Sequence, residues 1–170
     1  MIDVLVNIGR RIPLSIVLVL HWGLFWLFNG IDKFANNNFG VTFSEALRTR
    51  LLPNIGIGAG EEDPSSTLPE IMAYLVGIAE IGLGVVFLLT LGLFLQRHAQ
   101  RWNMAQIGIT LSVLMFLVLS FGTIILGDRN ALLQHGVFIA TLLLTAMTLR
   151  HFHNAEAEDE ASELESESAE

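Results

Sequence analysis

Cysteine is absent from the 170 residues, and charged residues are scarce. The lack of thiols excludes disulfide exchange, iron–sulfur clusters and thiolate metal sites from this chain. Only 15% of the residues are charged, whereas about a quarter are charged in a typical soluble domain. The sequence contains no basic patch, so nothing favours nucleic-acid binding, and it predicts no metal site. These absences point to the membrane class of proteins.

The net charge of −8 is concentrated at the end of the chain. Eight of the seventeen acidic residues lie in NAEAEDEASELESESAE, residues 154–170. The rest of the chain is close to neutral, so an acidic enzyme surface is not inferred. A segment this polar cannot bury enough apolar surface to fold alone. We therefore predict a disordered acidic tail over residues 150–170. It is interpreted as a solvated segment, with a docking segment as the alternative.

Long apolar blocks account for most of the remaining sequence, which is 52% hydrophobic overall with a mean hydropathy of +0.58. Four blocks reach the roughly 20 helical residues that cross a bilayer core: residues 13–31, 70–95, 105–127 and 130–149. Their continuous runs do not match the alternating pattern of a membrane β-barrel. The predicted fold is all-α, an integral-membrane four-helix bundle over residues 13–149.

Lysine and arginine placement predicts the orientation, because cytoplasmic helix ends carry more of these residues. One side of the membrane receives Arg10, Arg11, Arg97, Arg101 and Arg150. Both termini, residues 1–12 and 150–170, are therefore predicted to be cytoplasmic. The first block is too long for the apolar region of a signal peptide and is interpreted as a membrane helix. The loop of residues 32–69 is then extracytoplasmic, and its TFSEALRTRLLP segment, residues 42–53, predicts a short helix.

His21 is the first of three ionisable residues inside the apolar blocks, where charge is expensive. At 100° per residue, one helix face carries His21, Phe25, Phe28 and Asp32. An aromatic face with a histidine and a carboxylate is a candidate site for a flat quinone headgroup. The alternative is a neutral imidazole that hydrogen-bonds a neighbouring helix. Gly23 and Gly30 lie on the opposite face, where they allow another helix to approach closely.

Glu80 lies in LVGIAEIGLG, on the same helix face as Gly77 and Gly84. Small residues around a carboxyl group indicate that it is surrounded by helices rather than by lipid. The structural interpretation is an interhelical hydrogen bond, with a histidine or arginine as a possible partner. The functional interpretation is a proton relay or a contact to quinone. We take Glu80, His21 and Asp32 as candidate residues for handling protons or quinone.

His135 is the third ionisable residue, in the fourth block. The first and fourth helices run antiparallel, and aligning Gly30 with Asn130 places His21 and His135 about 6 Å apart in depth. That spacing is compatible with two axial ligands on one b-type haem, and equally with coincidence. His21, Phe25, Phe28 and His135 are thus candidate cofactor-binding residues, for a quinone first and for haem second.

The segments GLFWLFNGIDKF, residues 23–34, and AEIGLGVVFLLTLG, residues 79–92, resemble the DoxX-like family. The resemblance spans most of residues 13–149 and implies a small four-helix protein of the bacterial inner membrane. Family members include subunits of thiosulfate:quinone oxidoreductases and proteins that associate with other membrane redox complexes. By position, the resemblance points to Gly30, Asp32, Lys33 and Glu80.

These observations lead to three competing hypotheses about the function. The first is a DoxX-like membrane subunit of a quinone-linked oxidoreductase or respiratory-type complex, with other membrane subunits and the lipid bilayer as partners. The second is a non-catalytic structural or assembly subunit of a larger membrane complex. A small transporter is the third and the least favoured, because the four helices show no internal repeat. Without cysteine, the chain has no residue for independent sulfur oxidation.

Overall fold

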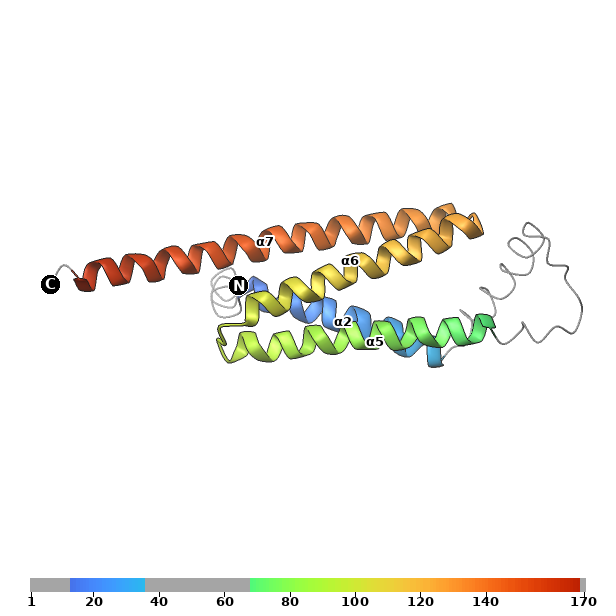
Figure 1. Cartoon of the computed structure of the whole chain (residues 1–170), viewed down its shortest axis with the longest axis horizontal. Helices are drawn as coiled ribbons and strands as arrows, with labels where there is room; N and C mark the ends of the chain where they lie inside the picture. The colour runs from blue at the N-terminus through green and yellow to red at the C-terminus, as the bar shows by residue number, and fades with distance from the viewer. Residues whose placement is uncertain (1–12, 36–67, 169–170) are drawn as a thin grey trace, which may run out of the picture.

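The computed structural model describes residues 13–35 and 68–168, and these residues form four helices (Figure 1). The helices are α2 (Leu14–Ala35), α5 (Leu68–Leu95), α6 (Arg101–Leu126) and α7 (Arg129–Ser168). Each is long and apolar enough to cross a membrane, which confirms the predicted all-α membrane bundle. The predicted helix at residues 42–53 and the N-terminal segment 1–12 lie outside the described residues.

The helices are arranged in a ring, in which α2 contacts α5, α5 contacts α6, α6 contacts α7 and α7 contacts α2. At one end, α2 begins, α5 ends and α6 begins; we call this the tail end. At the other end, α2 ends, α5 begins and α6 ends; we call this the loop end. Helix α7 runs back from the loop end past the tail end (Figure 1). The start of α2 and the end of α7 therefore lie towards the same end of the bundle.

Glycines bring α2 and α5 into close contact along their length. A Cβ atom on Gly30 would lie 2.8 Å from the carbonyl oxygen of Gly77, and one on Gly84 would lie 2.8 Å from the backbone nitrogen of Leu27. Gly23 and Gly30 are seven residues apart, as are Gly77 and Gly84, so each pair returns to one helix face. We call these four residues the glycine seam. The seam confirms the predicted close approach of another helix to α2.

Aromatic side chains fill the space between α2 and the helices opposite. The largest fully buried side chains include Trp22, Trp26 and Phe87. The indole nitrogen of Trp22 donates to the hydroxyl of Thr145 at 3.1 Å, and this hydroxyl donates to the carbonyl of Thr141 at 2.9 Å. Because the Trp22 N–H has a partner, the ring can be buried without leaving a polar group unsatisfied.

The α6–α7 turn is fixed by two residues. Gly127 adopts φ 72°, the left-handed conformation that glycine tolerates best, and its N–H donates to Ile124. The side chain of Asp128 then accepts hydrogen bonds from the backbone N–H groups of Asn130 and Ala131 at 3.1 and 3.0 Å. An aspartate in this N-cap position satisfies donors at the start of a helix. The turn therefore reverses the chain in very few residues.

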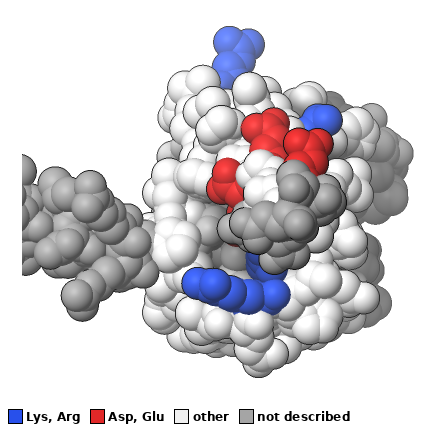
Figure 2. Space-filling model, turned by 90° about the vertical axis from the view of Figure 1, so that its left-hand side faces the viewer, with Lys and Arg blue, Asp and Glu red and all other residues white. Residues whose placement is uncertain are grey.

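The acidic tail differs from the prediction of disorder, which was wrong for the described residues. Helix α7 continues through this segment to Ser168. The segment is rich in alanine and glutamate, which favour helix, and it extends a helix that is already formed, so it avoids the cost of nucleation. Seen from the tail end, its Asp and Glu side chains gather on one protrusion, whereas Lys and Arg lie apart from one another (Figure 2).

Glu156 ties this extension of α7 to the start of α6. Its carboxylate accepts hydrogen bonds from the Arg101 guanidinium at 2.6 Å and from the Trp102 indole nitrogen at 3.2 Å. The His153 ring stacks on Trp102 with the centroids 5.3 Å apart. Arg101 also donates to the carbonyl of Arg97 in the α5–α6 turn. We call Arg101, Trp102, His153 and Glu156 the tail clamp.

Substitution of Gly84 by alanine is expected to destabilise the bundle. The new methyl group would lie against the backbone of Leu27, which cannot move aside as a flexible side chain can. Overpacking of this kind typically costs about 1–3 kcal/mol. Gly82 on the same helix has open space around its Cβ position, so Gly82→Ala is the matched control and should be neutral or slightly stabilising. Thermal unfolding in detergent measures both; equal melting temperatures would contradict the glycine seam.

Substitution of Glu156 by alanine is expected to release the helical extension from α6. Amide hydrogen exchange over residues 157–168 should become faster, because the extension loses both its charged contact and the Trp102 hydrogen bond. The contact is partly exposed, so salt should weaken it in the unsubstituted protein as well. Glu158→Ala, at an exposed position, is the control. Exchange rates that are the same in both variants would show that the clamp does not hold the extension.

Candidate functional site

Lys33 and Glu80 form a buried ion pair at the loop end of the α2–α5 contact. The Lys33 ammonium donates to the Glu80 carboxylate at 2.6 Å, and the two side chains are only 12% and 4% exposed. Lys33 lies three residues after Gly30, and Glu80 three residues after Gly77. The glycine seam therefore brings the two side chains together, because residues three apart lie on one helix face.

Asp32 and an aromatic pair lie at the same end of α2 and α5 as the ion pair. Asp32 is exposed and close enough to Glu80 to interact with it electrostatically. The rings of Phe34 and Tyr74 stack at 5.5 Å. A second carboxylate beside the pair places two acids and one lysine at this end of α2 and α5. The arrangement can hold a proton or donate a hydrogen bond.

The residues predicted to share one aromatic face of α2 differ in their exposure. His21 is exposed, and Phe28 is 63% exposed, so both lie on the surface that lipid would cover. Phe25 instead turns partly inwards, where its ring meets Phe138 at 5.0 Å and Phe116 at 6.2 Å. His21 keeps a ring contact with Phe25 at 6.5 Å. A ligand that diffuses in the bilayer would reach His21 and Phe28 without entering the bundle.

His135 belongs to an aromatic cluster between α2, α6 and α7. Its ring lies 5.8 Å from Phe116, which also contacts Trp26 at 4.7 Å and Phe138 at 5.2 Å. Within the described residues, the buried Nδ1 of His135 and the buried indole nitrogen of Trp26 have no hydrogen-bond partner. Unpaired polar atoms of this kind are uncommon in buried positions. Both atoms are candidate contacts for a small polar group inside the bundle.

The prediction that His21 and His135 lie about 6 Å apart in depth was wrong. Trp22 bonds Thr145, and Phe25 contacts Phe138, so His21 lies level with residues 142–146 of α7. His135 is therefore about 10–16 Å away along the helix axis. Two histidines that ligate one haem face each other across its iron, and this geometry does not favour that arrangement. Among the residues described, no three His, Asp or Glu side chains gather as metal ligands.

Sequence reasoning found the two charged residues but not all of their surroundings. The partner of Glu80 was sought among histidines and arginines, whereas the structure supplies Lys33, to which only the resemblance pointed. The contact of His135 with Phe116 was missed, as were the contacts of Phe116 with Trp26 and Phe138. Helical spacing places residues on a face, but it does not say which faces of different helices meet.

Three comparisons bear on the family of this chain. Protein-family models, curated proteins and solved structures each give no match to it. The chain is a multi-pass membrane protein by the length and composition of its four helices, and its function has to be inferred from the geometry of the site.

Proposed function

We propose that this chain is a DoxX-like membrane subunit of a quinone-linked oxidoreductase, in which Lys33 and Glu80 contact the quinone headgroup or the protons that it exchanges. The observation that supports the proposal is the 2.6 Å ion pair, buried at the end of the α2–α5 contact. The membrane is proposed to be the bacterial inner membrane. The electron donor is a partner subunit.

The ion pair adds little to the packing of α2 and α5. The glycine seam already holds the helices in contact, and interhelical hydrogen bonds in membranes contribute only about 0.6 kcal/mol on average. Taking two charges out of water is costly, and apolar residues of similar volume often replace a buried ion pair without loss of stability. A chemical role therefore explains the pair better than a purely structural role.

The groups at the loop end suit a quinone headgroup. A quinone has two carbonyl oxygens, which accept hydrogen bonds and take up protons when the ring is reduced. The Lys33 ammonium can donate a hydrogen bond, and the Glu80 carboxyl can hold or release a proton. Asp32 lies at the exposed side of the pair. On the same helix, His21 and Phe28 face the lipid phase in which quinones diffuse.

A structural or assembly subunit is the second candidate, and the protruding extension of α7 favours it. This extension runs beyond the other helices (Figure 1) and carries acidic side chains, where another subunit can reach them. In this interpretation, Lys33 and Glu80 satisfy each other and meet no substrate. The two candidates differ in what happens when the charges are removed without changing the packing.

Substitution of Glu80 by glutamine, and of both Lys33 and Glu80 by methionine, distinguishes the two functions. Glutamine keeps the shape of the side chain but cannot ionise, and two methionines fill the space without charge. We expect both variants to fold and both to bind a short-chain benzoquinone at least roughly tenfold more weakly, a loss of about 1.4 kcal/mol. Quenching of Trp22, Trp26 and Trp102 fluorescence in the purified protein measures the affinity.

Glu158→Gln is the control for this experiment, because it makes the same chemical change at an exposed position outside the bundle. It should bind the benzoquinone as the unsubstituted protein does. Unchanged affinity in the Lys33→Met/Glu80→Met variant, together with an unchanged melting temperature, would contradict the quinone function. The structural candidate would then be the better one.

The orientation is tested with single cysteines, since the chain has none of its own. Arg97, Arg101 and Arg150 lie towards the tail end, so we expect both termini to be cytoplasmic. In intact spheroplasts, an impermeant thiol reagent should label Ser65→Cys and leave Ser166→Cys unlabelled. The opposite labelling would invert the orientation.

A further inference from the structure

Two polar atoms inside the bundle, away from the proposed quinone site, are buried without a hydrogen-bond partner. Within the described residues, these are the indole nitrogen of Trp26 and the Nδ1 atom of His135. The Trp26 side chain is only 1% exposed and lies about 18 Å from the start of α2. Both residues belong to helices long and apolar enough to span the membrane. Acyl chains offer no hydrogen bonds, so lipid does not supply the missing partner.

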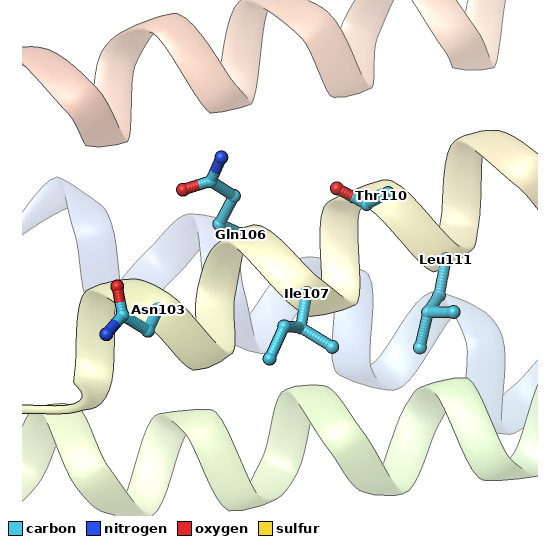
Figure 3. Close-up of a pocket in the computed structure, with 5 residues that line it drawn as sticks. All are labelled: Asn103, Gln106, Ile107, Thr110 and Leu111. Carbon is cyan, nitrogen blue, oxygen red and sulfur yellow. The ribbon is translucent and has the colours of Figure 1, made fainter.

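Polar groups elsewhere in the helices satisfy this need in other ways. An open hollow on the outer surface of α6 is lined by exposed polar side chains, which the surroundings of the bundle can reach (Figure 3): Asn103, Gln106 and Thr110. The buried hydroxyl of Ser112 donates to a carbonyl of its own helix at 2.8 Å. Trp26 and His135 are neither exposed at these atoms nor bonded to their own helices.

Trp26 and His135 contact the same phenyl ring. The ring centroid of Phe116 lies 4.7 Å from that of Trp26 and 5.8 Å from that of His135. Trp26 follows His21 by five residues on α2, and α7 runs in the opposite direction, so Trp26 lies level with residues 137–141. His135 is then about 3–9 Å away along the helix axis. A molecule that bonds both atoms would join α2 to α7.

We propose that a water molecule bound in this aromatic cluster bonds both the Trp26 indole N–H and the Nδ1 atom of His135. An indole nitrogen only donates, so its partner has to accept. The Nδ1 of a neutral imidazole accepts or donates, depending on which nitrogen carries the proton. Water suits both cases, whereas a carbonyl group cannot donate and an ammonium group cannot accept. Buried waters typically bond polar groups that are otherwise unsatisfied.

The packing of the cluster also favours a molecule as small as water. The rings of Phe25, Phe116 and Phe138 lie 5.0, 5.2 and 6.2 Å from one another. Rings at this spacing are in direct contact, so another ring cannot enter between them. One water needs only about 10–15 Å³, and with bonds of about 2.9 Å it joins atoms up to about 6 Å apart. It adds a second polar link between α2 and α7, beside the Trp22–Thr145 hydrogen bond.

Two substitutions and their combination test the shared water. Trp26→Phe removes the N–H, and His135→Leu removes Nδ1. Each single change takes away one of the two groups that hold the water, which leaves the other buried atom unsatisfied and costs stability. The two changes together leave no polar atom to satisfy. The loss of melting temperature in the double variant, measured in detergent, should therefore be smaller than the sum of the two single losses.

Trp26→Phe combined with Phe138→Leu is the matched control. Phe138 contacts Phe116 at 5.2 Å, much as His135 does at 5.8 Å, but its side chain has no polar atom. The two losses in this control pair should add. Additive losses in the pair of Trp26 and His135, or an equal departure from additivity in the control pair, would overturn the proposal.

Nuclear magnetic resonance detects the water directly. In deuterated detergent, the Trp26 indole N–H signal is identified by its absence in Trp26→Phe, and it should show a cross-peak to water protons. This cross-peak should disappear in His135→Leu. It should persist in His135→Asn, whose amide oxygen takes the place of Nδ1, and in Gln134→Leu, at an exposed neighbouring position. A missing cross-peak in the unsubstituted protein, or an unchanged one in His135→Leu, would show that the two residues do not share a water.

Discussion

The close approach of α2 and α5 is the constraint on which the rest of the structure depends. Between membrane helices, association comes from packing rather than from the hydrophobic effect, so small residues decide where backbones can meet. In this chain, the glycine seam lets α5 lie directly against α2. This contact brings Lys33 within 2.6 Å of Glu80. It also leaves Trp22 on the side of α2 that reaches Thr145 on α7.

The second constraint is that polar groups inside the bundle need partners, because lipid supplies none. The chain meets it in three ways: hydroxyls bond back to their own helix, the Trp22 indole bonds Thr145, and Lys33 bonds Glu80. Two groups do not follow this rule: within the described residues, the buried indole nitrogen of Trp26 and the buried Nδ1 of His135 have no hydrogen-bond partner.

Composition and spacing were enough to predict the helices and the glycine faces, because both depend on residues close together in the sequence. The Lys33–Glu80 pair could be predicted only in part, since a helical face shows that Glu80 is enclosed but does not identify its partner. The tail was predicted wrongly because its composition was judged alone. Helix α7 continues into this segment, and Glu156 contacts Arg101, so the segment does not have to form a helix by itself.

The two ion pairs join neighbouring helices at opposite ends of the bundle. Lys33–Glu80 joins α2 to α5 at the loop end, and Arg101–Glu156 joins α6 to α7 at the tail end. The glycine seam adds a second contact between α2 and α5. Of the described glycines of α6 and α7, none brings these two helices as close: a Cβ atom on Gly108 would meet Phe87 of α5, and Gly122 and Gly136 have open space at this position.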